Sequence, residues 1–191
     1  MAADVAVDQR RELVSRLLPQ IFRDVDPRRR LTVLDVGPGG ASSVRFFGGF
    51  RCHVVFADLF DDLGEGEAGM AAAGRLFEDL GDVRYDICLF WDFLNYLSAA
   101  DLREFGRALR RHLHSGSRAH AFAAFTTVSD LTGLRFELCD ESRIRVLSER
   151  GPTPHRHTNK VIGRVLWPLS VSRAVLLEHN RQELLLAAGP G

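Results

Sequence analysis

The sequence predicts an α/β fold: a doubly wound, mostly parallel sheet with helices on both faces and a C-terminal antiparallel hairpin. Short apolar, β-branched runs alternate with helical patterns from residue 31 to residue 125. This order is typical of a parallel sheet whose right-handed crossovers place helices on both faces. A glycine-rich turn follows the first run. Only a short polar segment separates the last two runs, which favours a hairpin.

The parallel part should contain four buried strands, because four short apolar runs end at glycines, acids or turn residues. The runs cover residues 31–36, 53–57, 87–91 and 119–125. Helical patterns between them cover residues 41–47, 66–80 and 99–113, and Ser42 or Ser43 is placed to cap the first of these helices. The tail should form a helix over 158–166 and two strands over 171–177 and 183–187.

The chain should form a single domain over residues 1–191, because its length suits one hydrophobic core and no linker divides it. Apolar residues recur at helical spacing near the start, so we expect an N-terminal helix over residues 8–25, kinked at Pro19. Residues 126–157 separate the fourth strand from the last helix and are expected to form an insert.

Charge and composition narrow the range of partners. The chain has 25 basic and 25 acidic residues and a formal net charge of zero, whereas nucleic-acid binders usually carry a basic surplus. This balance excludes DNA as an expected partner and disfavours RNA. The sequence has no apolar run long enough to span a membrane, and its three cysteines are widely spaced, so a cytoplasmic protein is expected. Homodimer formation is left open.

The first strand and its turn carry the main motif. Asp35, Gly37 and Gly39 occupy an Asp-x-Gly-x-Gly pattern directly after an apolar strand. This pattern resembles the first motif of class I S-adenosylmethionine-dependent methyltransferases, although Ala41 stands where that motif has its last glycine. The dinucleotide fingerprint fits less well, because Ser42 stands where its third glycine should be. The resemblance implies that Gly37 and Gly39, with Pro38 between them, line the methionine part of S-adenosylmethionine. It implies that Asp35 helps to fix either the turn or the amino group of the cofactor.

Two further segments extend the resemblance. Asp58, with Leu59 beside it, closes the second strand at the place where the family has an acid that holds the ribose hydroxyls. The segment 85–96 resembles the fourth motif of the family, which implies that Trp91, Asp92 and Asn95 lie near the cofactor. The third strand of the family is weak here, so Glu78 or Asp79 is the candidate for the adenine contact.

The candidate bases are Asp92, His120 and either His155 or His157, of which Asp92 and His120 are the predicted catalytic residues. Methyl transfer from a sulfonium depends mainly on positioning, and a general base helps where the acceptor is a hydroxyl. The residue types in themselves allow plainer roles: a helix cap for Asp92, a buried hydrogen-bonded side chain for His120, and core packing for Trp91. No metal is expected, because the paired histidines at 112, 114, 155 and 157 lack ligands at zinc spacing.

Two hypotheses on function follow. The first is a metal-free S-adenosylmethionine-dependent methyltransferase that acts on a small molecule or a protein side chain, with the insert 126–157 covering the substrate. The alternative is a catalytically inactive protein of the same fold that serves as an interaction or regulatory module. The matching Asp35 and Asp58 favour the first hypothesis, and the weak third strand favours the second.

Overall fold

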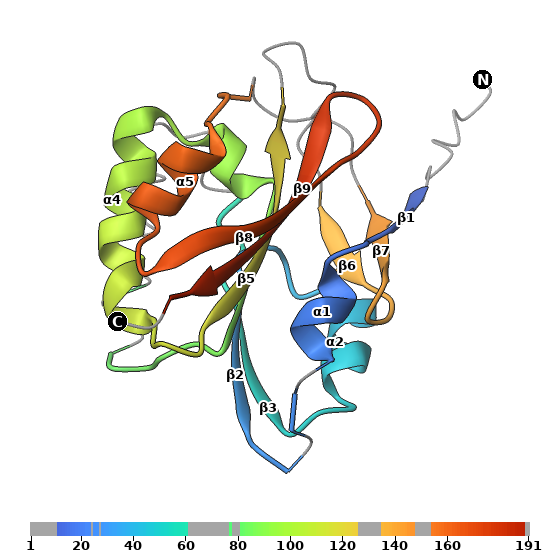
Figure 1. The fold of residues 1–191 in the computed structure, drawn as a ribbon. Helices are drawn as coiled ribbons and strands as arrows, with labels where there is room; N and C mark the ends of the chain where they lie inside the picture. Colours follow the sequence, from blue (N-terminus) through green and yellow to red (C-terminus); the bar gives the residue numbers. More distant parts are fainter. Residues whose placement is uncertain are drawn as a thin grey trace, which may run out of the picture.

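Two β-sheets organise the computed structural model, which describes residues 11–23, 25–26, 28–60, 77, 81–125, 135–147 and 154–189. The larger sheet has six strands in the order β3-β2-β4-β5-β9-β8, and the smaller has three in the order β1-β7-β6. Figure 1 shows the long β8–β9 hairpin crossing the centre of the molecule and the small sheet at its side.

Four parallel strands form one side of the larger sheet, and they lie where the apolar runs predicted them. They are β2 (Leu31–Asp35), β3 (Cys52–Phe56), β4 (Ile87–Trp91) and β5 (Arg118–Ala124). The strand β2 pairs in parallel with both β3 and β4, and β4 pairs in parallel with β5. The chain therefore moves from β2 to one side and then returns to the other, which places a topological switch point between β2 and β4.

The remaining two strands form the predicted antiparallel hairpin of β8 (Leu169–Leu176) and β9 (Arg181–Ala188). Strand β9 pairs antiparallel with β5 and with β8. His179 and Asn180 both have positive φ in the short connection between the two strands, a backbone conformation that is common in tight hairpin turns. The sequence prediction of a doubly wound, mostly parallel sheet with a C-terminal antiparallel hairpin is confirmed.

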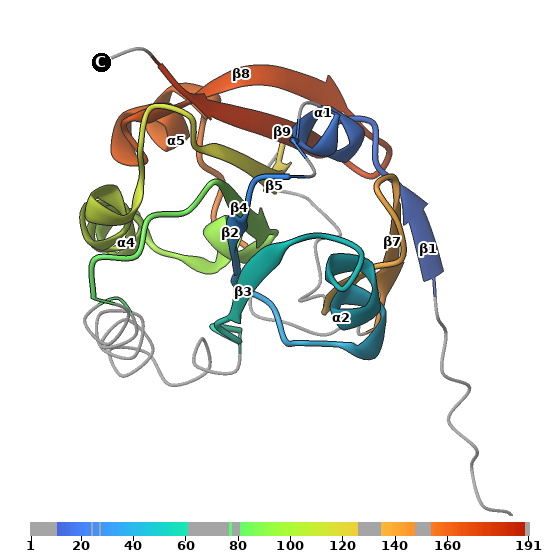
Figure 2. The ribbon, with the colours of Figure 1, turned by 90° about the horizontal axis from the view of Figure 1, so that it is seen from below.

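Helices cover both faces of this sheet. The α-helices are α1 (Leu18–Phe22), α2 (Ala41–Phe47), α4 (Ala99–Leu109) and α5 (Asn159–Val165), and the 3₁₀ turns are η2 (Phe93–Tyr96) and η3 (Arg110–His112). Helices α4 and α5 lie together on one face, whereas α1 and α2 lie on the other (Figures 1 and 2). The Ser98 hydroxyl caps α4 and the Thr158 hydroxyl caps α5. The helix predicted over 66–80 lies outside the described residues, apart from Phe77.

The expected N-terminal helix over 8–25 is wrong. Among the described residues, this region forms the strand β1 (Arg11–Val14) and then the short helix α1. Pro19 lies in the first turn of α1, where its missing N–H costs no hydrogen bond, so it helps begin a helix rather than kinking one. Strand β1 pairs antiparallel with β7 from the insert. That long-range pairing overrides the local helical spacing.

The predicted insert contributes the rest of the small sheet. Its described residues form β6 (Phe136–Leu138) and β7 (Arg143–Val146), which pair antiparallel. Strand β6 lies against α2, the helix that follows the glycine turn. The small sheet therefore covers the α1–α2 face near the start of α2.

A continuous apolar core joins both sheets, from Leu17 and Leu18 of the N-terminal segment to Leu184 and Leu186 of β9. Cys88 is buried in this core, whereas Cys52 and Cys139 are half-buried, and all three are free thiols. Within the part of the chain that the structure describes, no helix combines the length and the apolar character needed to cross a bilayer.

Candidate functional site

The carboxyl edge of the parallel strands brings three predicted acids together. Asp35 ends β2, Asp58 follows β3 and Asp92 follows β4. In the sheet these three strands are neighbours, with β2 in the middle. Ligands of open α/β sheets bind at this edge, at the switch point of the strand order. These three acids therefore lie at the ends of neighbouring strands, at the part of the carboxyl edge where open α/β sheets have their ligand crevice.

Burial strongly perturbs the carboxyl group of Asp35. Its side chain is fully buried, and its Oδ1 atom accepts hydrogen bonds from the Gly37 amide at 2.9 Å and from the Trp91 indole nitrogen at 2.6 Å. Its Oδ2 atom is buried and accepts no hydrogen bond from any described residue. Burial raises the pKa of Asp35 to about 7, and the nearby charge of Asp58 adds to the effect. Within the described residues, one carboxylate oxygen of Asp35 thus has no hydrogen-bond donor, and buried polar atoms of this kind are more frequent at functional sites than elsewhere.

The glycine turn brings the backbone close to its neighbours. A Cβ atom on Gly37 would lie 3.2 Å from Asp35 Oδ1 and from the Trp91 indole nitrogen, and one on Gly39 would lie 3.1 Å from the Phe56 ring. The carbonyl of Pro38 accepts a hydrogen bond from the Gly40 amide at 2.9 Å, which tightens the turn. The turn needs glycine for close approach, as the motif implies.

Asp58 and Leu59 close β3 and fasten its end to β2. The Asp58 amide donates to the Gly37 carbonyl at 3.3 Å, and the Leu59 amide donates to the Val36 carbonyl at 2.9 Å. Asp58 has a φ of 43°, an uncommon conformation for a residue with a side chain. Leu59 is buried, so its side chain belongs to the core, whereas the half-buried Asp58 lies at the edge.

Trp91 joins the crevice to the aromatic core. It has a φ of 49° at an irregularity in the β4–β5 pairing, and its side chain is fully buried. The indole ring stacks on Phe136 of β6 with 5.3 Å between the ring centroids and 13° between the planes. Positive φ in a bulky residue is a strained conformation, and such strain concentrates at functional sites.

Asp92 and Asn95 differ in how their side chains are used. Asp92 is fully buried, and its Oδ2 atom accepts the Tyr96 hydroxyl proton at 2.7 Å. Asp92 begins η2, but its side chain accepts no capping hydrogen bond, so the plainer role of a helix cap is wrong. The Asn95 side chain bonds three backbone groups, of Asp92, Phe122 and Ala124. Asn95 therefore fastens η2 to the end of β5, and its cofactor contact stays a prediction.

His120 lies in a separate buried network. Its Nε2 atom is 2.8 Å from Glu183 Oε1, and both side chains are fully buried. Glu183 also accepts hydrogen bonds from the Ser15 hydroxyl and from the amides of Arg16 and Leu17. Burial acts to raise the pKa of Glu183, but the hydrogen bonds and charge of His120, with Ser15 and Arg16, lower it to about 2. The network fastens the N-terminal segment to β9, and a role of His120 as a base stays a prediction.

Comparison with known proteins agrees with this geometry. No family profile and no curated protein matches the sequence. Among solved structures, a 1,6-didemethyltoxoflavin N1-methyltransferase from Burkholderia thailandensis is similar over 92% of this chain and 78% of its own, with 14% identity and a TM-score of 0.51. The chain has the class I methyltransferase fold.

Two other similar structures have lower scores. A S-adenosylmethionine-dependent methyltransferase from Clostridium acetobutylicum is 14% identical over 91% of this chain and 96% of its own, with a TM-score of 0.46. A pyocyanin biosynthetic protein is 16% identical over 90% of this chain, which spans only 54% of that protein, also with a TM-score of 0.46. At these identities the similarity concerns the fold alone.

The insert adds a cover to this class I methyltransferase fold. The Leu138 amide donates to the Ser43 hydroxyl at 2.9 Å, and an Arg145 guanidinium nitrogen donates to the Ser42 hydroxyl at 2.8 Å. The prediction that one of these serines caps α2 is therefore wrong. The N-cap residue of α2 is Gly40. No side chain caps the helix, because the hydroxyls of Ser42 and Ser43 bind the insert instead.

Glu137 of β6 is the residue that sequence reasoning missed. It is 8% exposed, and its carboxylate lies against the glycine turn: a Cβ on Gly40 would lie 1.9 Å from Glu137 Oε1. Arg145 lies 3.6 Å from the same carboxylate. No local pattern in β6 marks Glu137, and only the packing of β6 on α2 brings it to the turn. The predicted adenine residues Glu78 and Asp79 lie outside the described residues.

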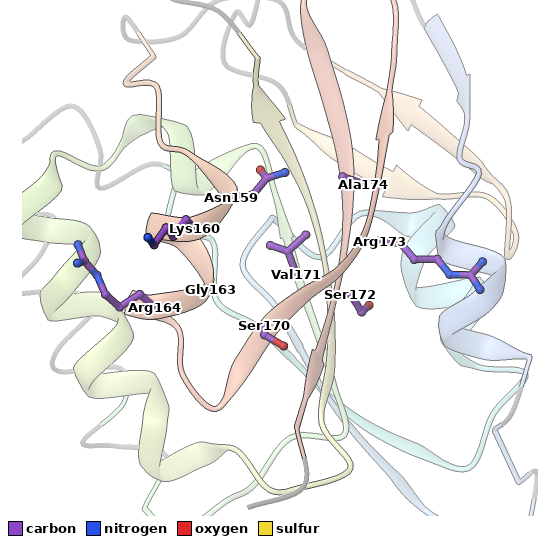
Figure 3. A pocket seen from close by; sticks show the side chains of 9 residues that line it. All are labelled: Asn159, Lys160, Gly163, Arg164, Ser170, Val171, Ser172, Arg173 and Ala174. Atoms are coloured by element: carbon purple, nitrogen blue, oxygen red, sulfur yellow. The ribbon is translucent and has the colours of Figure 1, made fainter.

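A groove of about 490 Å³ lies apart from the carboxyl edge, between α5 and β8. Figure 3 shows Lys160 and Arg164 extending from α5, while Arg173 extends from β8 in the opposite direction. The groove includes none of the residues predicted for cofactor binding or catalysis. Within the described residues, no group of three or more histidine, cysteine or acidic side chains could hold a metal ion.

Proposed function

We propose that the chain is a metal-free S-adenosylmethionine-dependent methyltransferase that acts on a small molecule or a protein side chain. The observation that carries the proposal is the buried Asp35 Oδ2 atom, which lacks a partner among the described residues and lies beside the glycine turn at the switch point. A cationic amino acid group is a suitable partner for it. The similar 1,6-didemethyltoxoflavin N1-methyltransferase, whose structure holds 1,6-didemethyltoxoflavin and S-adenosylhomocysteine, agrees with this proposal.

The residues present fit S-adenosylmethionine in their chemistry. Asp35 would accept hydrogen bonds from the amino group of the methionine part, and Gly37, Pro38 and Gly39 would let the backbone approach it closely. Asp58 carries a carboxylate suited to a ribose diol, with Leu59 packed beneath it. The cofactor, when bound, supplies a methyl group that is already activated on a sulfonium.

The chain itself then has to position the acceptor, exclude water and take up a proton where the acceptor loses one. Trp91 and Phe136 form a dry aromatic wall beside Asp35. Asp92 is held by the Tyr96 hydroxyl at the end of β4, where it is the best placed of the predicted bases. Most of the expected rate enhancement comes from positioning, which is typical of this chemistry.

The proposal is tested by calorimetric titration of the purified protein with S-adenosylmethionine and S-adenosylhomocysteine, using the wild type and Asp58→Ala. We expect micromolar binding of both ligands and at least a tenfold weaker affinity in the variant, which corresponds to about 1.4 kcal/mol. Asp140→Ala is a matched control, because Asp140 pairs with Arg143 on the insert, away from the crevice. A folded wild-type protein that binds neither ligand would refute the proposal that the chain is a methyltransferase.

One observation favours the alternative of a catalytically inactive module. The Glu137 side chain lies directly against Gly40, and β6 is fastened to α2 by Ser43. A cover fixed in this position would keep the methionine part of a cofactor out of the turn. If this is so, Glu137→Ala should create binding of S-adenosylmethionine that the wild type lacks, and equal affinities would reject the alternative.

A further inference from the structure

The Trp91 side chain is fully buried, and its one polar atom and one of its ring faces are engaged within the protein. The indole nitrogen donates to Asp35 Oδ1 at 2.6 Å. The ring stacks on Phe136, and the His120 ring lies against it with 6.0 Å between the centroids and 68° between the planes. Indole has a single donor and no acceptor, so Trp91 has no polar atom left for a ligand. Its hydrogen bond acts on Asp35 alone.

This hydrogen bond decides which carboxylate oxygen of Asp35 is occupied. The Gly37 amide donates to the same Oδ1 atom at 2.9 Å, and Oδ2 accepts no hydrogen bond from any described residue. Rotation about the Cβ–Cγ bond of an aspartate is broad, so one donor alone leaves the carboxylate a wide range of orientations. A second donor on the same oxygen narrows this range and keeps Oδ2 in one place.

The Trp91 ring also lies against the glycine turn. A Cβ atom on Gly37 would lie 3.2 Å from the indole nitrogen of Trp91 and 3.3 Å from its Cδ1 atom. The ring and the turn can approach this closely because Gly37 has no side chain. Trp91 therefore contacts both parts of the first motif, the acid and the turn, from the neighbouring strand β4.

The backbone of Trp91 has an uncommon conformation at this place. Its φ is 49°, and the pairing of β4 with β5 changes register between Leu89 and Trp91. Leu89 is the residue of β4 that pairs with Asp35 of β2. A bulky residue at positive φ is strained, and such strain persists where the surrounding structure imposes it, often at functional sites. The strained residue is the one that donates to Asp35.

We propose that Trp91 is a positioning residue of the cofactor site, whose indole N–H holds the Asp35 carboxylate so that Oδ2 faces the amino group of the methionine part. Trp91 acts through Asp35 rather than through a hydrogen bond of its own to the cofactor. This inference rests on the proposed methyltransferase function and deepens it, because it gives the conformation at the end of β4 a role in cofactor binding.

The wild-type protein allows a first test by NMR that needs no substitution. Burial raises the pKa of Asp35 to about 7, while the hydrogen bonds from Trp91 and Gly37 act to lower it. As Asp35 ionises, the bond from the indole becomes charge-assisted, so the Trp91 indole N–H signal should move downfield with a midpoint near pH 7. The exposed Trp167 should not follow this titration. A Trp91 signal that does not titrate overturns the inference.

Trp91→Phe removes the N–H donor and keeps a large ring. The midpoint of the Asp35 carboxyl signal, followed by ¹³C NMR without cofactor, should move upward by about 1 pH unit or more, because the ionised form loses a donor. Phe105→Leu is the matched control, since Phe105 is as deeply buried but packs on Phe90 and Phe93. It should lower the urea midpoint of unfolding, as Trp91→Phe does, and leave the Asp35 midpoint unchanged.

Titration with S-adenosylmethionine connects the orientation of Asp35 to binding. At neutral pH, Trp91→Phe should bind the cofactor about tenfold more weakly than the wild type or worse, because the amino group loses a fixed and ionised partner. Trp167→Phe makes the same substitution at the tryptophan that is 55% exposed, and it should leave the affinity unchanged.

An Asp35 midpoint that stays the same in Trp91→Phe, or that moves equally in Phe105→Leu, overturns the inference whatever the cofactor does. A midpoint that moves while the affinity for S-adenosylmethionine stays unchanged overturns the positioning role alone. A wild-type protein that binds no S-adenosylmethionine overturns the methyltransferase proposal, and the cofactor role of Trp91 with it, even where both NMR titrations come out as expected.

Discussion

Asp35 and Glu183 are two fully buried carboxylates on strands of the same sheet, and the structure surrounds them differently. Glu183 accepts hydrogen bonds from a histidine, a serine hydroxyl and two backbone amides. Asp35 accepts two, both on Oδ1, and its Oδ2 atom has no partner among the described residues. Burying a charged carboxylate costs free energy, and in the described part of the chain only at Glu183 do hydrogen-bond donors of the surrounding protein satisfy both carboxylate oxygens.

The pKa values record this difference. The pKa of Glu183 is lowered to about 2, whereas burial raises the pKa of Asp35 to about 7. A matched buried carboxylate stabilises the fold. An unmatched one destabilises it until a ligand supplies the missing partner, which is typical of a binding site. Glu183 is therefore a structural residue, whereas for Asp35 we propose a role in binding, and the following predictions test this contrast.

The largest expected effect comes from Glu183→Ala. This change leaves His120, Ser15 and two amides without their acceptor in a buried place, so the free energy of unfolding should fall by roughly 3–5 kcal/mol. Urea unfolding measures this quantity. Glu178→Ala, on the same hairpin but with a 91% exposed side chain, should change it by less than about 0.5 kcal/mol. Equal effects of the two variants would mean that the Glu183 network contributes no more to the free energy of unfolding than an exposed carboxylate does.

Asp35→Asn should change how stability depends on pH. In the wild type the pKa of Asp35 rises from 3.8 when unfolded to about 7 when folded, so the folded state keeps its proton up to a higher pH than the unfolded state. The free energy of unfolding should therefore fall as pH rises from about 4 to 7, with a slope approaching about 1.4 kcal/mol per unit. Asp35→Asn should remove this slope, as followed by urea unfolding at several pH values.

Glu183 acts in the opposite direction and in a lower pH window. Its pKa falls from 4.5 to about 2 on folding, so its contribution is complete above pH 4.5 and is lost as pH falls towards 2. The two carboxylates can therefore be separated in one experiment. Parallel pH profiles for the wild type and Asp35→Asn would show that Asp35 is not held at a raised pKa.

Gly40→Ala should have a medium effect through the cover of the crevice. Gly40 has a φ of −70°, which alanine adopts freely, so the main obstacle among the described residues is the Glu137 side chain, which supplies the three atoms nearest to the new Cβ. We expect a loss of roughly 1–3 kcal/mol from overpacking, and recovery in the double variant Gly40→Ala/Glu137→Ala. Additive losses in the double variant, measured by thermal or urea unfolding, would show that Glu137 does not lie against the turn.

The smallest expected effect is that of Arg145→Met. Arg145 bonds the Ser42 hydroxyl and lies 3.6 Å from Glu137, but its side chain is 29% exposed. The loss should be under about 1 kcal/mol, because partly exposed pairs contribute little. A loss above 3 kcal/mol would mean that the small sheet depends on Arg145 rather than on its strand pairing.

Much of the fold could be predicted from local sequence patterns, and so could the residues that lie at the carboxyl edge of the sheet. The apolar runs that became β2 and β4, each followed by a glycine turn or an acid, are enough to place Asp35 and Asp92 together. The N-terminal helix was wrong because Leu13 and Leu17 also suit a strand followed by a turn. Only pairing with β7, more than 120 residues away in sequence, decides between them.

The environments of the site residues could not be predicted in the same way. His120 and Glu183 are 63 residues apart in sequence, and their contact depends on the pairing of β5 with β9. Glu137 reaches the glycine turn only because the insert folds back over α2. Such contacts between distant segments decide whether a buried carboxylate is matched, and no periodicity in the sequence carries that information.

The most direct test of the account is an NMR titration of the protein with S-adenosylmethionine, following the two tryptophan indole N–H signals. The Trp91 indole donates to Asp35 beside the glycine turn, whereas Trp167 is 55% exposed and packs with Arg110 on the far side of the sheet. The account predicts a saturable shift of the Trp91 signal and a fixed Trp167 signal. A folded protein in which the Trp91 signal stays unchanged at millimolar ligand would contradict it.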